Sequence, residues 1–343
     1  MLVPAPPSRV QVACDRPLRP DGEYVLYWMT SARRTRSSFG LQHAVWHAQE
    51  LGRPLLVLEA LRAGHEHNTA RVHRFVLDGM ADNARRFGEA GVLYFPYVEP
   101  IAGAGSGLLA ALSRRASVIV TDGSPIYFLP RMLASAAAQV SCRLESVDGN
   151  GVVPLASTTQ PFSTAASFRR VLHRGVEGHL EDAPVPDPLQ GYAGGRAVIP
   201  PEVLLRWPAT PLAALTDPGF LAALPLDHEV PPVVGLVGGS RAGGARIERF
   251  VGSRLAGYPA DSRHPDADGE SGLSPYLHFG HVGSHEVVEA ILEAEAWHPG
   301  RLREERAGSR EGFYGLSEGA EAFLDQLLTW RELGFVFAHH RGA

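Results

Sequence analysis

Short apolar runs alternate with amphipathic stretches through the first half of the chain. Between residues 69 and 90, apolar side chains recur every three or four positions at Val72, Phe75, Val76 and Met80, which is the period of a helix. The pattern predicts strands at 24–29, 55–60, 92–98, 117–122, 142–148 and 152–155, and helices at 37–51, 69–90, 107–115 and 127–139. Strands separated in this way by helices are typical of a parallel, doubly wound sheet. We therefore expect a Rossmann-like α/β domain over residues 23–155.

The pattern changes after this domain. Prolines are frequent and periodic runs are short over residues 156–240, which indicates a long inter-domain linker. From 241 to 343 we expect a helical domain, and the periodic stretches within it are 245–256, 275–295 and 319–338. Residues 1–22 lack the continuous apolar core of a signal peptide, so we expect them to form a disordered lead-in.

Composition narrows the class of protein. The chain has 343 residues, of which 45% are hydrophobic, and this gives enough apolar side chains for two domains. No apolar run approaches the roughly 18 residues of a membrane span, so we expect no membrane partner. The two cysteines, Cys14 and Cys142, cannot form a disulfide framework, and a cytoplasmic location is expected. The net charge of −5 argues against a protein that coats nucleic acid but leaves room for a local basic groove.

The segment SGLSPYLHFG at 271–280 suits the start of a helix. Ser274 is a good N-cap and Pro275 a good first helical residue. Backbone N–H groups at such a start point back at Ser271, Gly272 and Leu273 and can hold an anion, above all a phosphate. The alternative is a cap that binds nothing.

Several other motifs are incomplete. The first turn after a strand, TSARRTRSS, has no glycine, so the dinucleotide-binding fingerprint is absent. The glycine-rich GLVGGSRAGGAR lacks the spacing and the Lys-Ser/Thr pair of a phosphate loop. HEVVE has Glu289 where a zinc-peptidase helix needs a histidine. His278, His281 and His285 share one face of the expected helix, but no cysteine or carboxylate pattern accompanies them. We expect no metal site.

The stretch AEAFLDQLLTWRELGFVF at 320–337 predicts an amphipathic helix dense in aromatic residues. Its phenylalanines suit a core helix. Arg331 can pair with an anionic cofactor or a phosphate, while the indole of Trp330 can stack on a flat ring.

SGLSPYLHFG and the later FLDQLLTWREL together resemble the paired signature of the photolyase/cryptochrome flavoproteins. Five further segments are similar to the class II cyclobutane pyrimidine dimer photolyases, namely YWMTSARRTRSSFGLQHA, NTARVHRFVLDGM, VIVTDGSPIYFLPR, VDGNGVVP and RIERFVGSRLAGYPADSRHPD. The resemblance extends over most of the chain, and the motifs occur in the family's order.

The resemblance implies a light-dependent carbon–carbon lyase that repairs DNA. Family members bind FAD in the helical domain and often carry a second, light-harvesting pigment of the deazaflavin or folate type. Reduced, light-excited flavin gives an electron to a cyclobutane dimer that is flipped out of UV-damaged DNA, and the dimer splits. We expect UV-damaged DNA as the partner and a monomeric protein.

The resemblance also implies roles for eight residues. The residues that match cofactor-binding positions are Tyr258, Ser271, Gly272, Leu273, Ser274 and Arg331. Tyr258 would lie near the FAD phosphates, the segment 271–274 would cradle the diphosphate, and Arg331 would lie along the flavin. Trp330 and Glu332 match catalytic positions, with Trp330 toward the lesion and Glu332 fixing Arg331.

Two departures from the family pattern lie near the C-terminus. The chain stops at Ala343, where family members continue, and GFVFAHHRGA lacks the usual Asn-Phe pair. We therefore expect a partial FAD-binding domain, truncated at its C-terminus. Two alternatives to a repair enzyme stay open at this point. One is a repair-inactive photoreceptor or binding module, and the other is a remnant in which only the α/β domain folds well.

Overall fold

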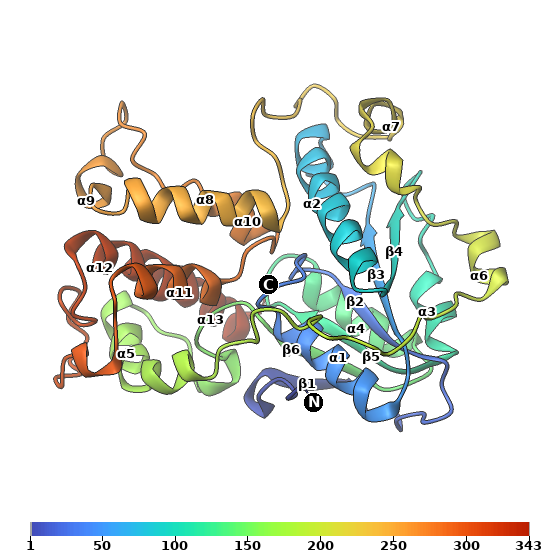
Figure 1. The fold of residues 1–343 in the computed structure, drawn as a ribbon, viewed down its shortest axis with the longest axis horizontal. Coiled ribbons are helices and arrows are strands. Elements are labelled where there is room, and N and C mark those ends of the chain that lie inside the picture. Colours follow the sequence, from blue (N-terminus) through green and yellow to red (C-terminus); the bar gives the residue numbers. More distant parts are fainter. Residues whose placement is uncertain (1, 343) are drawn as a thin grey trace.

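The computed structural model describes residues 2–342 of the chain. Met1 and Ala343, at the ends of the expected lead-in and helical domain, lie outside the described residues. Figure 1 shows two lobes, one built around a sheet and the other built from helices. The strands follow the order β1-β6-β5-β2-β3-β4, with the bounds β1 Val10–Cys14, β2 Tyr24–Met29, β3 Leu55–Leu61, β4 Leu93–Val98, β5 Ala116–Gly123 and β6 Leu144–Asp148. Neighbouring strands are parallel except for β1, which runs antiparallel to β6.

Alternate residues of the strands face two separate apolar cores, as the two-residue period of a strand requires. In β2, Tyr24 and Leu26 face the core that helices α3 and α4 cover. Val25 and Tyr27 face the core that α1 and the end of α2 cover. These helices have the bounds α1 Phe39–Leu51, α2 Ala70–Glu89, α3 Leu108–Ser113 and α4 Leu129–Gln139. The expected doubly wound sheet is therefore confirmed.

The N-terminal region differs from the expectation in two places. Residues 10–14, expected in a disordered lead-in, form strand β1, because VQVAC adds to the exposed edge of β6 by antiparallel pairing. Residues 152–155, expected as a strand, do not pair with any strand of the sheet and lead into the short 3₁₀ helix η2 (Leu155–Ser157). Another 3₁₀ helix, η1 (Pro7–Arg9), precedes β1.

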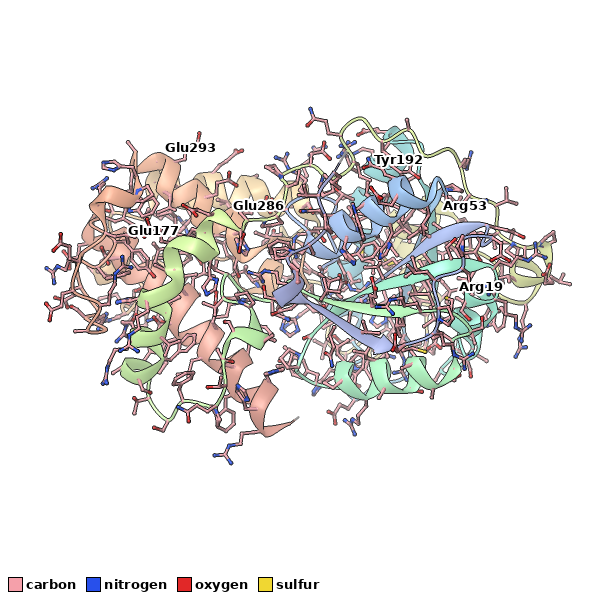
Figure 2. The ribbon with its side chains drawn as sticks, turned by 90° about the horizontal axis from the view of Figure 1, so that it is seen from below. Arg19, Arg53, Glu177, Tyr192, Glu286 and Glu293 are labelled. Carbon is pink, nitrogen blue, oxygen red and sulfur yellow. The ribbon has the colours of Figure 1, made fainter. Side chains whose placement is uncertain are left out.

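The expected linker contributes to both lobes. Its helix α5 (Ala165–Glu181) places Leu172 and Val176 in the core of the helical lobe. The later part runs along the sheet lobe through α6 (Pro201–Arg206), η3 (Leu212–Thr216) and α7 (Pro218–Ala223). Figure 2 shows Tyr192 on the sheet lobe, and its hydroxyl accepts the backbone N–H of Leu55 at 2.7 Å. This region is therefore packed structure rather than a free connector.

The helical lobe follows the expected order with two interruptions. Its elements are α8 Ser240–Ser253, α9 Tyr258–Asp261, α10 Ser274–His278, α11 Ser284–Ala294, η4 Pro299–Arg301, α12 Glu318–Leu324, η5 Asp325–Trp330 and α13 Arg331–Arg341. The helix expected at 275–295 is broken at Gly280, whose φ of 72° ends α10. The helix expected at 319–338 is continuous, but η5 is a π-helical turn within it. Among the described residues, no helix has both the length and the apolar character to cross a membrane.

Candidate functional site

A cavity of about 1330 Å³ lies between the two lobes. Its floor consists of the segments that follow the parallel strands, including residues 30–34 after β2, and residues 124–128 together with the first turn of α4 after β5. Its opposite wall comes from the helical lobe, with His278 and Ser284 beside Arg331. β2 and β5 are adjacent and their connections leave in opposite directions, which makes this the topological switch point of the sheet. Doubly wound sheets bind ligands at this position.

Asp122, at the end of β5, organises the loop after β2. Its Oδ2 accepts the backbone N–H groups of Thr30 at 2.8 Å and of Ser31 and Ala32 at 3.0 Å. Its Oδ1 accepts the hydroxyl of Tyr27 at 2.6 Å, and burial together with the nearby Asp122 raises the pKa of Tyr27. The carboxylate thereby holds the loop that carries Arg33 and Arg34 to the cavity.

Arginines give the cavity a positive charge. Arg33 is paired with buried Glu59 at 2.8 Å. Arg34 donates to the carbonyl oxygen of Ser37 in its own lobe and to that of Gly280 across the lobe boundary, and burial lowers the pKa of Arg34. Arg62 and Arg131 also line the cavity, and they have no carboxylate partner among the ion pairs of the described residues. The cavity can therefore take an anionic group.

Arg331 lines this cavity. It donates to the carbonyl oxygen of Asn150 at 2.5 Å and to Ser284 Oγ at 3.0 Å, and its guanidinium lies 4.7 Å from the ring centre of Phe335. Burial lowers the pKa of Arg331 to about 10, so the side chain stays a cation at neutral pH. Its neutral hydrogen-bond partners leave that charge available to an anionic ligand.

Glu332 does not hold Arg331 as expected, because the carboxylate points to a different part of the chain. It accepts the backbone N–H groups of Val152 at 2.7 Å and Val153 at 2.9 Å. Burial raises the pKa of Glu332 to about 7, although these hydrogen bonds oppose the shift. Trp330 lies outside the cavity lining and its side chain is 52% exposed on the helical lobe.

The other expected cofactor residues gather away from the cavity lining. Helix α10 begins at Ser274, and Leu273 holds the N-cap position, so the N-cap role expected for Ser274 is wrong. Ser271 Oγ accepts the N–H of Leu273 instead, at 3.2 Å, and Leu273 itself is buried in the core. Tyr258 packs edge-on against Phe323, at 5.2 Å between ring centres.

A positive side chain lies beside this segment. Gly272 has φ 66°, and a Cβ there would come within 3.2 Å of the guanidinium carbon of Arg246. The glycine therefore lets the backbone approach an arginine closely, which suits a diphosphate. Arg246 begins the segment RIERFVGSRLAGYPADSRHPD, but no role was expected for it, because an arginine on an amphipathic helix is ordinary.

Both regions fit parts of a flavin nucleotide. The segment 271–274 with Arg246 offers an anion-binding surface. The cavity offers aromatic and apolar walls with arginines, and its volume exceeds the roughly 300–1,000 Å³ of an ordinary small-ligand pocket, so a dinucleotide-sized group has room. The structure does not bring Tyr258 and 271–274 into one cavity lining with Arg331.

Comparisons with known proteins agree with the resemblance. No family model matches the chain. It is 24% identical over 322 residues to the deoxyribodipyrimidine photo-lyase of Methanothermobacter thermautotrophicus, with 93% of this chain and 62% of that protein covered. It is 25% identical over 291 residues to the deoxyribodipyrimidine photo-lyase of Potorous tridactylus, with 83% of this chain and 50% of that protein covered. The chain thus spans less than two thirds of the length of these relatives.

Solved structures share the fold. A bacterial class III photolyase from Agrobacterium tumefaciens superposes with a TM-score of 0.62 at 17% identity, over 93% of this chain and 59% of that one. A cryptochrome from Synechocystis superposes with a TM-score of 0.56 at 16% identity, over 93% of this chain and 62% of that one. The expected class II subgroup stays a prediction. The chain is thus similar to proteins named deoxyribodipyrimidine photo-lyase over most of its length, and it shares the fold of solved photolyases and of a cryptochrome.

Proposed function

We propose that the chain acts as a photolyase-type flavoprotein that repairs cyclobutane pyrimidine dimers in UV-damaged DNA. The observation that carries this proposal is the similarity to proteins named deoxyribodipyrimidine photo-lyase over 83% to 97% of this chain. FAD, when bound, reduced and excited by light, would supply the electron that splits the dimer. The reaction class would be a carbon–carbon lyase.

The chain's own residues would bind and orient the cofactor. Arg246 and the backbone of 271–274 would hold the diphosphate, because a glycine with positive φ lies directly against the guanidinium. Tyr258 would close this side through its packing on Phe323. Arg331 would face an anionic or polar edge of a ligand in the cavity, where its charge has no carboxylate partner among the described residues.

The exposed indole of Trp330 supports a role on the DNA side. A large aromatic side chain that is 52% exposed can stack on a base that has left the duplex. Glu332 would position α13 through the segment 152–153 and would not contact the cofactor.

The sheet side of the cavity would hold a second, light-harvesting pigment of the deazaflavin or folate type, and the side that Arg331 lines would face the flavin. The sheet side lies at the carboxyl ends of the strands, where doubly wound sheets bind nucleotide-like ligands. An archaeal photolyase from Sulfolobus tokodaii, which superposes with a TM-score of 0.59 at 12% identity, contains two FAD molecules, which imply a novel light-harvesting cofactor in that protein.

The experiment that tests the proposal begins with an absorption spectrum of the purified chain, before and after incubation with FAD and gel filtration. Flavin bands that elute with the protein, followed by light-dependent loss of dimers from UV-irradiated DNA, are the expected result. Flavin retention without repair, in light and with the flavin chemically reduced, would favour a photoreceptor or binding module. A protein that retains no flavin and repairs no dimers would overturn the proposal.

A further inference from the structure

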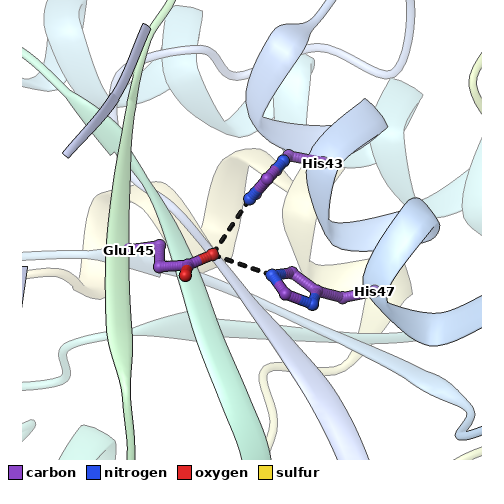
Figure 3. A group of neighbouring side chains, drawn as sticks. All are labelled: His43, His47 and Glu145. Atoms are coloured by element: carbon purple, nitrogen blue, oxygen red, sulfur yellow. Dashed lines mark hydrogen bonds and ion pairs between the residues drawn. The ribbon is translucent and has the colours of Figure 1, made fainter. Parts of the chain in front are cut away.

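Two histidines and a glutamate meet inside the sheet lobe, outside the cavity lining. Figure 3 shows His43 and His47 on α1 pointing at Glu145 on β6. Nε2 of His43 lies 2.9 Å from Glu145 Oε2, and Nε2 of His47 lies 2.7 Å from the same oxygen. All three side chains are buried, and the three donor atoms lie within 4.8 Å of one another.

The fold creates this convergence from a simple pattern. His43 and His47 are four residues apart, so they lie on one face of α1, and that face packs against β6. On β6, Leu144 faces the core under α3 and α4, so Glu145 points to the opposite side of the sheet, toward α1. A carboxylate at such a position is costly unless strong partners surround it.

We propose that His43, His47 and Glu145 form a binding site for a divalent transition metal ion, with zinc as the best match. Two imidazole nitrogens and one carboxylate oxygen are a zinc ligand set, and a fourth position stays open for water. Ligands on a tetrahedral zinc ion lie roughly 3.4 Å apart, as follows from metal–ligand distances of about 2.0–2.2 Å. The observed separations of 2.9 Å and 2.7 Å need to open by about 0.5–0.7 Å to reach this value.

The surroundings of Glu145 favour its role as a ligand. Arg143 donates to its other oxygen, Oε1, at 2.6 Å and fixes the orientation of the carboxylate. Burial opposes ionisation, but hydrogen bonds from His43, His47 and Arg143 outweigh it and lower the pKa of Glu145. Oε2 therefore carries negative charge and faces the two imidazoles.

Metal binding at this site would also affect the N-terminal segment, because Ala5 contacts His43. The backbone N–H of Ala5 points at Nδ1 of His43 at 3.3 Å, which requires Nδ1 to be an acceptor and Nε2 to carry the hydrogen. A metal ion on Nε2 moves that hydrogen to Nδ1, where it opposes the N–H of Ala5. Metal binding therefore competes with docking of residues 2–5, which Gln42 also holds through the carbonyl oxygen of Val3.

The first test is zinc binding by the full chain after treatment with a chelator, followed by isothermal titration and metal analysis. We expect one high-affinity zinc ion per chain. His47→Gln keeps a side-chain amide that can donate to Glu145 but removes a ligand, and it should weaken binding more than about tenfold. His67→Gln, at an exposed histidine beside His65, is the matched control and should bind as the unchanged chain does.

Two further measurements keep the proposal falsifiable if His47→Gln fails to fold. Glu145→Gln retains a hydrogen-bond acceptor for both histidines, and its zinc affinity should fall similarly. Cobalt added to the unchanged chain should give the intense visible absorption of a four-coordinate site, and hydrogen exchange at residues 2–5 should rise on zinc binding. The proposal is overturned if the chain takes up no stoichiometric zinc, or if both ligand variants bind zinc as tightly as His67→Gln. A weak cobalt spectrum typical of six-coordinate metal would also overturn the proposal, because it would show that the bound metal lies on surface groups and not at His43, His47 and Glu145.

Discussion

Glu332 accepts the backbone N–H of Val152, which lies 180 residues earlier in the chain, at 2.7 Å. The neighbouring Arg331 donates to the carbonyl oxygen of Asn150, so two consecutive residues of α13 hold one short segment after β6. Gly151 lies between these contacts, and a Cβ there would come within 2.6 Å of the Glu332 carboxyl carbon. These hydrogen bonds join α13 of the helical lobe to the segment that follows the last strand of the sheet lobe. They also fix the part of the cavity wall that Arg331 forms.

We predict that Glu332 makes stability depend on pH. Burial raises its pKa from 4.5 to about 7, so the folded chain holds this proton more tightly than the unfolded chain does. The stabilisation is full below about 4.5 and is lost as the pH rises to about 7. The shift corresponds to about 3 kcal/mol of unfolding free energy. Urea unfolding of the unchanged chain and of Glu332→Gln, measured between pH 5 and pH 8, should show a flatter profile for the variant. Parallel profiles would contradict the prediction.

Gly280 connects the lobes through a close backbone approach. It has φ 72°, and a Cβ would lie 1.7 Å from the carbonyl oxygen of Ser31. We predict that Gly280→Ala lowers the free energy of unfolding by at least about 3 kcal/mol, because strain and overlap add. Gly252→Ala is the control. This residue lies in α8 with open space around it, so the change should stabilise the helix by up to about 1 kcal/mol. Equal unfolding free energies for the two variants would show that the lobes do not meet in this way.

Arg169 and Asp325 form a buried ion pair at 2.8 Å between α5 and the π-helical turn η5. Without Arg169, Asp325 keeps only the more distant and more exposed Arg310, whose Nε lies 3.8 Å from Asp325 Oδ2. Removing one partner of a buried ion pair costs about 3–5 kcal/mol. We predict this loss for Arg169→Met, measured by urea unfolding. Arg174→Met, at an exposed position on the same helix, should change stability by less than about 0.5 kcal/mol. A small effect at Arg169 would mean that α5 does not dock on the helical lobe.

Much of the fold follows from local patterns. The strand 24–29 was predictable because each of its faces enters an apolar core, and α2 because its apolar positions repeat at helical spacing. β1 was missed because VQVAC is short, follows a proline-rich segment and is stabilised only by pairing with β6. The break at Gly280 was missed because its cause is Ser31, in the other lobe.

The candidate site was predictable only in part. Resemblance to a family marked Arg331, which the structure places in the cavity, but no local pattern shows that Glu332 faces Val152. Asp122 was missed for the same reason, since its partners lie 90 or more residues away. The spacing of His43 and His47 was visible in the sequence. Their convergence with Glu145 depends on the packing of α1 against the sheet, which no local motif encodes.

Arg246 tests where a diphosphate binds. If FAD places its diphosphate beside Gly272, removing this guanidinium deletes at least one charge-assisted hydrogen bond, worth about 1.5–3 kcal/mol. We predict that Arg246→Ala weakens FAD binding by about 10- to 100-fold. Arg249→Ala, three residues further along α8 and exposed, should bind FAD as the unchanged chain does. Fluorescence titration with FAD measures the affinity of both variants. Equal affinities would show that the diphosphate does not bind beside this segment.

Arg331 tests the cavity independently of that segment. Its guanidinium is held by neutral groups, Asn150 O and Ser284 Oγ, so a bound anion would be its main charge partner. We predict that Arg331→Ala weakens flavin binding by about 10- to 100-fold, as expected for a lost buried charge-assisted contact. Arg196→Ala, at an exposed position in the segment between α5 and α6, should leave flavin affinity unchanged. Unfolding curves of both variants separate loss of the ligand contact from loss of the fold. If Arg331→Ala stays folded and retains flavin as well as Arg196→Ala does, Arg331 does not contact the flavin. Its position in the cavity would then be explained by its hydrogen bonds to Asn150 and Ser284 or by contact with the second pigment.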